Sequence, residues 1–143
     1  MRFNSVSKEQ LSEFKQRAVN AEIETGVNEA CEIINRHPSF VTMWSCEGHM
    51  DPPGQIHIVF CCAEGQEYLI EKLMTELYTS NVEPLWQLTH CRLYHYDKWS
   101  PDVPMTTNNS YPVWKISYNY LLDIESLNEV RTVLTNSIKR VFI

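Results

Sequence analysis

The sequence predicts one α+β domain over residues 1–143, in which an antiparallel sheet packs against helices in the order α-β-β-α-β-β-α. Apolar residues recur every three or four positions in three long segments, as in amphipathic helices, and alternate in shorter segments, as in strands. The strands come in adjacent pairs, without the βαβ alternation of a parallel sheet. A chain of 143 residues is long enough to bury one hydrophobic core.

The first helical segment is expected to begin at a capping box. The Ser7 hydroxyl is expected to accept a hydrogen bond from an early backbone amide of the helix, while the Gln10 side chain reaches back toward Ser7. Apolar residues then recur at helical spacing, and His37-Pro38 marks the end of the helix. Gly26 could divide this segment into two helices.

The next segments predict a hairpin and a helix. Residues 40–44 are rich in β-branched and aromatic side chains, which favours a strand. Asp51-Pro52-Pro53-Gly54 is a turn, and residues 55–62 alternate as a second strand, with which the first is expected to pair antiparallel. Residues 64–79 form an amphipathic helix. All helices are expected on one side of the sheet.

Two further strands are expected at 85–96 and 113–120. The proline-rich segment 97–112 between them is irregular, and long connections of this kind are usually functional or mobile. A last helix begins after Asp123, which can cap it, and carries Lys139 and Arg140 near its C-terminal end.

Composition excludes several classes of protein. A hydrophobic fraction of 43% and a charged fraction of 21% argue against extensive disorder. The net charge of -6 argues against non-specific binding to long nucleic acid. No run approaches the ~18 apolar residues of a membrane helix, so no membrane association is expected. The five cysteines form no disulfide framework, which predicts free thiols in a reducing compartment such as the cytoplasm.

The candidate site is the segment Ser45-Cys46-Glu47-Gly48-His49, expected as a loop between a strand and a turn. Gly48 permits a left-handed backbone or the close approach of a ligand. Successive backbone amides and the Ser45 hydroxyl could hold an anion, with His49 adding a hydrogen bond or a positive charge. Glu47 would oppose an anion unless it binds a ribose hydroxyl or a base edge. The alternative is an ordinary hairpin connection.

Thr42, Ser45, Cys46 and Gly48 fit the pattern Thr-x-x-Ser-Cys-x-Gly, which resembles the opening signature of the wybutosine-synthesis methyltransferase family. The resemblance implies a related fold, a cofactor and substrate cleft at this segment, and S-adenosylmethionine as methyl donor. Small acidic domains with a Ser-Cys-Glu-Gly-His segment also resemble proteins of bacteriophage accessory genes. That second resemblance implies an oligomer that sequesters a host nucleotide or a nucleotide-derived signal.

The preferred hypothesis is a homo-oligomeric module that binds a phosphate-bearing small molecule, a nucleotide derivative. Exposed aromatic rings would stack on the base, and Arg92 or Lys115 would bind phosphate. For each aromatic ring, packing in the core or an interface is the alternative. The predicted ligand-binding residues are Thr42, Trp44, Ser45, Cys46, Glu47, Gly48, His49, Arg92, Trp99 and Tyr111.

Four alternatives stay open. The chain could be an S-adenosylmethionine-dependent methyltransferase, or an interaction domain that docks a partner through Trp99 and the 97–112 segment. Cys46-x-x-His49 could bind zinc together with another histidine, although it supplies only one half-site and the sequence assigns no metal site. The candidate partners for zinc are His57, His90 and His95. Cys46 could also be a nucleophile activated by His49.

Overall fold

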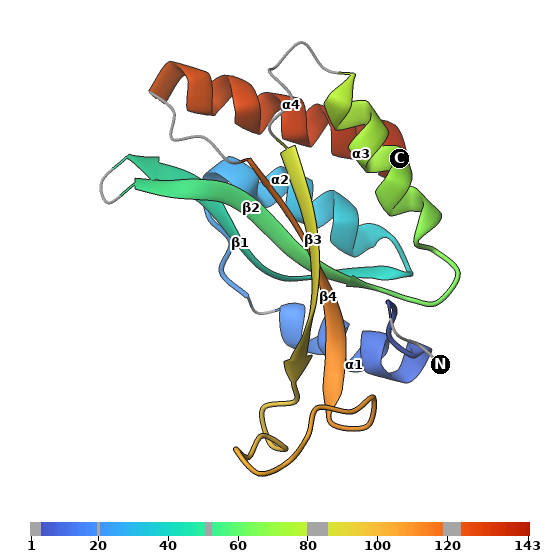
Figure 1. The fold of residues 1–143 in the computed structure, drawn as a ribbon. Helices are drawn as coiled ribbons and strands as arrows, with labels where there is room; N and C mark the ends of the chain where they lie inside the picture. The colour runs from blue at the N-terminus through green and yellow to red at the C-terminus, as the bar shows by residue number, and fades with distance from the viewer. Residues whose placement is uncertain (1–3, 20, 51–52, 80–85, 119–123) are drawn as a thin grey trace.

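The computed structural model describes residues 4–19, 21–50, 53–79, 86–118 and 124–143. These residues form an α+β fold with a four-stranded antiparallel sheet and four helices, in the order α-α-β-β-α-β-β-α (Figure 1). The fold class and the antiparallel sheet are as predicted. The order differs because the first helical segment forms two helices.

The two first helices are α1, Lys8–Ala18, and α2, Thr25–Arg36. Ser7 is the N-cap of α1, and its Oγ accepts a hydrogen bond from the Gln10 amide at 3.1 Å. The other half of the predicted capping box is wrong, because the Gln10 side-chain amide lies 3.0 Å from His95 Nε2 instead. Gly26 is the second residue of α2, so the break in the helix precedes it.

The strands are β1, Phe40–Met50, β2, Pro53–Cys62, β3, Trp86–Tyr94, and β4, Ser110–Tyr118. They are ordered β1-β2-β4-β3, which places β1 and β3 at the two edges of the sheet. All neighbouring strands are antiparallel, and β1 and β2 pair as the predicted hairpin. Asp51 and Pro52 of the predicted turn, and the predicted cap Asp123, lie outside the described residues.

The prediction that residues 45–49 form a loop is wrong. Strand β1 continues through them, with Ser45 opposite Ile58, Cys46 opposite His57 and His49 opposite Gly54. Polar side chains are compatible with a strand here because β1 is an edge strand and is covered less completely than a central one. Gly48 does adopt the left-handed backbone that the sequence suggested, with φ of 83°, but within the strand rather than in a turn.

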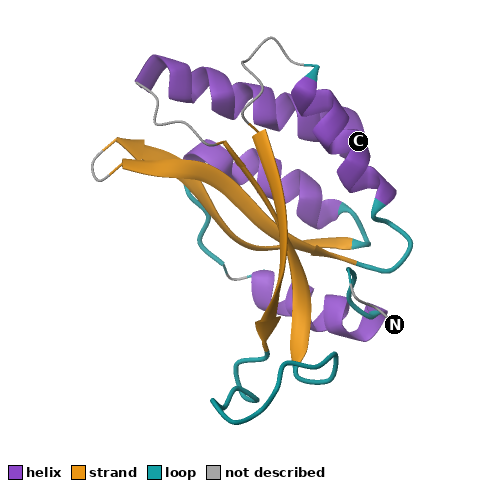
Figure 2. Ribbon diagram, in the orientation of Figure 1, coloured by secondary structure: helices purple, strands orange, loops and turns teal. Residues whose placement is uncertain are grey.

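The helices lie on both faces of the sheet (Figure 2). Helices α2, α3, Tyr68–Tyr78, and α4, Ile124–Phe142, bury Ile56, Ile58 and Phe60 of β2 on one face. Helix α1 packs on the other face, where Leu11 and Phe14 join Val59 of β2 in a second core cluster. Alternate residues of a strand face opposite sides, so β2 contributes to both clusters.

The expectation that all helices cover one side is therefore wrong for α1. Because α1 and α2 lie on opposite faces, the chain between them has to pass around an edge of the sheet. A continuous helix could not make this change of face. Among the described helices, none combines the length and the apolar character that a membrane crossing requires.

Candidate functional site

Side chains from two other elements bind the backbone of β1 at the motif. The Glu47 amide donates to Glu24 Oε1 at 3.2 Å, just before α2. The Arg131 guanidinium of α4 donates to the carbonyl oxygens of Glu47, at 2.7 Å, and Gly48, at 3.0 Å. Backbone groups at the edge of a sheet need such partners when no further strand covers them.

These contacts change the predicted chemistry of the motif. The Glu47 amide already holds a carboxylate, and the groups that Glu47 and Gly48 present to Arg131 are carbonyl oxygens, which do not bind anions. The predicted concavity of amides around an anion is therefore not what these two residues form. Positive charge beside the motif comes from a side chain of α4 instead.

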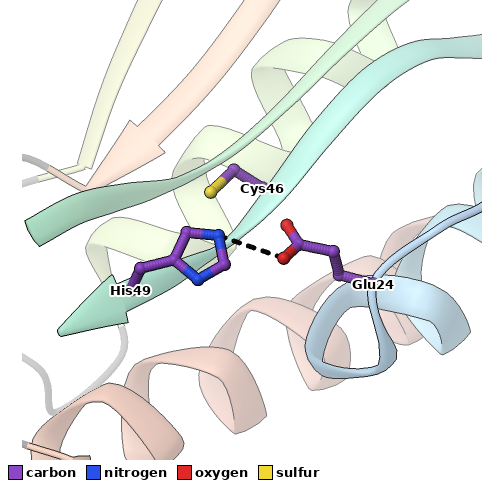
Figure 3. Close-up of side chains that lie close together, drawn as sticks. All are labelled: Glu24, Cys46 and His49. Atoms are coloured by element: carbon purple, nitrogen blue, oxygen red, sulfur yellow. Dashed lines mark ion pairs between the residues drawn. The ribbon is translucent and has the colours of Figure 1, made fainter. Parts of the chain in front are cut away.

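Glu24, Cys46 and His49 gather on one side of this edge (Figure 3). His49 Nε2 lies 3.0 Å from Glu24 Oε2, and the side-chain donor atoms of all three residues lie within 4.8 Å of one another. The Glu24 and His49 side chains are 38% and 42% exposed, so the cluster is accessible from solvent. The sequence paired Cys46 with His49 but did not identify Glu24.

The surroundings of the Cys46 thiol raise its pKa. Burial raises the pKa of Cys46, and the carboxylates of Glu24 and Glu47 raise it further, against the opposing effect of the Gly48 amide. The sulfur, the Glu24 carboxylate and the imidazole lie close together, and Glu24 Oε2 is 3.0 Å from His49 Nε2. A cysteine nucleophile requires the imidazole beside the sulfur and a lowered pKa. The raised pKa of Cys46 argues against the nucleophile hypothesis.

A polar recess of about 540 Å³ lies beside Glu47, against α2 and α4. Its lining includes Gly26, Glu47, Asn128, Arg131, Thr135 and Lys139. The Glu47 carboxylate accepts from the Gly26 amide at 2.6 Å, and Lys139 Nζ lies 2.7 Å from Glu29 Oε1. Arg131 donates to the two carbonyl oxygens and to Asn128 Oδ1 at 3.0 Å, all of which are neutral acceptors.

The other predicted residues of β1 differ in how deeply they are buried and in which residues they contact. Thr42 is buried, and its hydroxyl and amide bond the Asn35 side chain of α2 at 2.8 and 2.7 Å, which is a structural role. Burial raises the pKa of the Cys31 thiol to about 11, while an interaction with the Ser45 hydroxyl acts in the opposite direction. Because Cys31 belongs to α2, Ser45 faces that helix. Trp44 is 46% exposed.

Arg92 lies on β3 at the other edge of the sheet, Tyr111 on the neighbouring strand β4, and Trp99 in the connection between these two strands. Arg92 donates to Ser110 Oγ at 3.0 Å and helps to line a separate recess of about 430 Å³. Tyr111 packs on Phe14 with ring centroids 5.0 Å apart, and Trp99 is 62% exposed. Strands β1 and β3 are separated by two others, roughly 14 Å at about 4.8 Å per step. The ten predicted residues therefore do not converge on one site.

The histidines considered for zinc are also dispersed. Only His57 lies opposite Cys46 in the strand ladder. His90 and His95 belong to the β3 side of the sheet, where His90 packs against Trp114 with ring centroids 4.5 Å apart and His95 contacts Gln10. The third donor close to Cys46 and His49 is the carboxylate of Glu24, and it is not one of the histidines that the sequence suggested.

Glu24 and Arg131 are the residues that sequence reasoning missed. Glu24 immediately precedes Thr25-Gly26, and becomes a helix-start residue only once the first segment is divided in two. Arg131 follows the buried Leu127 by four positions and precedes the buried Leu134 by three, so it lies beside the apolar stripe of α4. A cation at that place in an amphipathic helix was the available signal.

No protein-family model matches the chain, and neither the curated proteins nor the solved structures give a match. The resemblances to the wybutosine-synthesis family and to bacteriophage proteins therefore stay predictions from the motif residues.

Proposed function

We propose that this chain binds a small molecule carrying a phosphate group, of the nucleotide class, in the recess between α2, α4 and Glu47. The observation that carries the proposal is the guanidinium of Arg131, hydrogen-bonded to neutral acceptors, in the wall of a recess of about 540 Å³ that the Glu29 and Glu47 carboxylates also line. Sites for small molecules commonly have volumes of roughly 300–1,000 Å³.

The lining provides a partner for each part of a nucleotide. Arg131 and Lys139 supply positive charge for phosphate, and the Thr135 hydroxyl can donate to a phosphate oxygen. The Glu47 carboxylate can accept from a sugar hydroxyl, the role that the sequence suggested for it. The side-chain amide of Asn128 can hydrogen-bond the edge of a base.

Calorimetric titration with adenosine monophosphate, inorganic phosphate and S-adenosylmethionine tests the proposal. Tight binding of the nucleotide, with weaker binding of phosphate alone, is the expected result. Removing a charged hydrogen-bond partner costs about 1.5–3 kcal/mol, so Arg131→Ala and Lys139→Ala should each weaken binding by about 10- to 100-fold. Arg36→Ala, an exposed cation at the end of α2, is the matched control and should leave binding unchanged.

Other outcomes would overturn the proposal. Binding of S-adenosylmethionine alone would favour the methyltransferase alternative, and binding of none of the three compounds would favour an interaction domain. Mass spectrometry of small molecules released from the purified protein adds a check without variants. Release of an unchanged nucleotide is expected of a module that sequesters a signal.

The proposal includes self-association in a reducing compartment, the cytoplasm. Exposed apolar side chains on the β3–β4 connection, Tyr96, Trp99 and Met105, are available for contact between copies. All five cysteines are free, which suits a reducing environment. Light scattering coupled to gel filtration measures the mass in solution, and a monomer at all concentrations would contradict this part of the proposal.

A further inference from the structure

We propose that Glu24, Cys46 and His49 form a binding site for a divalent transition-metal ion of the zinc class. The ligands would be the Cys46 thiolate, His49 Nε2 and a carboxylate oxygen of Glu24. This inference does not rest on the proposed function, because phosphate would bind to Arg131 and Lys139, which are not ligands of the metal.

The distances suit a metal ion. Zinc binds sulfur at about 2.3 Å and nitrogen or oxygen at about 2.0–2.2 Å, so tetrahedral ligands lie roughly 3.3–3.8 Å from one another. The three donor atoms already lie within 4.8 Å of one another, and His49 Nε2 is 3.0 Å from Glu24 Oε2. Rotations of these partly exposed side chains can close the remaining gap of about 1 Å.

The backbone of β1 explains how the cluster arises. Residues three apart in a regular strand face opposite sides of the sheet, so Cys46 and His49 should diverge. Gly48 lies between them with φ of 83°, far from the extended range, while the pairing of β1 with β2 stays in register on both sides of it. We infer that the left-handed glycine lets both donors approach Glu24, in agreement with the proximity of the three side chains.

Glu24 is held in place by a second interaction. Its Oε1 accepts from the Glu47 amide at 3.2 Å, while its Oε2 faces His49. Outer hydrogen bonds of this kind orient metal-binding carboxylates and are a regular part of metal sites. The ligand is thereby tied to the same strand that carries the other two donors.

The donor set indicates the class of metal. A thiolate, an imidazole and a carboxylate together suit zinc and its neighbours in the first transition row better than magnesium or calcium, which prefer oxygen ligands only. Three protein ligands with partial exposure leave a fourth position for water or for a ligand from solution, as in zinc sites of the open type.

The rival explanation is an ordinary ion pair between Glu24 and His49. Such exposed pairs are common and contribute little to stability. The pair does not require the thiol of Cys46, whereas a metal site does. The role of the sulfur therefore separates the two explanations.

Titration of the metal-stripped full chain with Co²⁺, followed by displacement with Zn²⁺, is the test. The expected result is one ion per chain and a thiolate-to-cobalt charge-transfer band that Zn²⁺ removes. Loss of one ligand in Cys46→Ser, His49→Asn or Glu24→Gln should weaken Zn²⁺ binding by about 10- to 100-fold or more. The matched controls Cys91→Ser and Glu22→Gln, both at exposed positions, should bind as the wild type does.

A measurement on the unaltered chain guards against variants that fail to fold. Zn²⁺ should protect Cys46 from alkylation and leave Cys91 reactive, as read by peptide mass spectrometry. Absence of the charge-transfer band, equal binding by Cys46→Ser, or alkylation of Cys46 unaffected by Zn²⁺ would each overturn the metal site. Nucleotide binding could survive any of these results, so the two proposals fail separately.

Discussion

Gly26→Ala tests how tightly the second helix is packed against the motif strand. A Cβ at this position would lie 2.8 Å from Glu47 Cβ, 2.7 Å from Glu47 Oε2 and 2.9 Å from Arg131 Nε. The two polar atoms belong to side chains that can rotate, but Glu47 Cβ is fixed by the pairing of β1 with β2. Relief of the contact therefore requires movement of the helix or of the strand.

Two opposing effects set the magnitude. Alanine in place of a helical glycine gains about 0.5–1 kcal/mol in backbone propensity. Overpacking costs about 1–3 kcal/mol, and the hydrogen bond from the Gly26 amide to the Glu47 carboxylate, 2.6 Å long, is worth about 1.5–3 kcal/mol if the shift breaks it. We expect a net loss of about 1–3 kcal/mol, which lowers the Tm by about 3–10 °C in a chain of this size.

Thermal and urea denaturation of Gly26→Ala measure this loss. Asn28→Ala, at an exposed position of the same helix, is the control for propensity and should stay within about 0.5 kcal/mol of the wild type. A Gly26→Ala variant that is as stable as Asn28→Ala, or more so, would refute the reasoning. It would show that the helix can move away from β1 at little cost.

Three further predictions concern the strand, the thiols and the histidines. Gly48→Ala should lose about 1–2 kcal/mol because alanine disfavours φ of 83°, and an unchanged urea midpoint would contradict this. A thiol reagent at neutral pH should label exposed Cys91 long before Cys61, whose burial raises the thiol pKa; peptide mass spectrometry reads the order, and early labelling of Cys61 would count against it. Burial, and then Lys15, lower the pKa of His37, so the unfolded chain takes up the proton first. That contribution to stability is present above about pH 6.5 and is lost as the pH falls below this value. Urea denaturation should therefore give a free energy of unfolding that decreases as the pH is lowered from 7 to about 5.5. A free energy of unfolding that stays constant or rises over this range would be inconsistent with the shift.

Hydrophobic periodicity predicted the strands, the hairpin and the helices because each depends on local spacing. It could not predict that α1 would cover the opposite face, since that depends on which face of the sheet the other helices leave open. Leu11 and Phe14 have the same spacing whichever face they cover. The first helical segment is divided because α1 and α2 cover opposite faces of the sheet. In the sequence, only the glycine at position 26 indicated this division.

The local structure of the segment 45–49 was not predicted from the sequence. Polar residues and a glycine suggested a loop, but hydrogen bonding to β2 extends the strand through them. The sequence paired Cys46 with His49, whose donor atoms lie within 4.8 Å of each other, whereas Glu24 and Arg131 come from distant parts of the sequence. A single sequence offers no signal that brings such residues together before the fold is known.

Glu24 and Arg131 have a structural role at the edge of β1, which is distinct from any role in binding a ligand. Glu24 satisfies the Glu47 amide, and Arg131 satisfies two carbonyl oxygens, so both would be needed even without a ligand. Satisfying the backbone does not require the Cys46 sulfur beside Glu24, or a second cation, Lys139, in the wall of the same recess. Lys139 pairs with Glu29, and the Cys46 thiol contacts the Gly48 amide of its own strand. Replacing Lys139 or Cys46 therefore separates binding from stability more cleanly than replacing Glu24 or Arg131. If both replacements left phosphate and metal binding unchanged, protection of a sheet edge would be a sufficient explanation of the whole cluster.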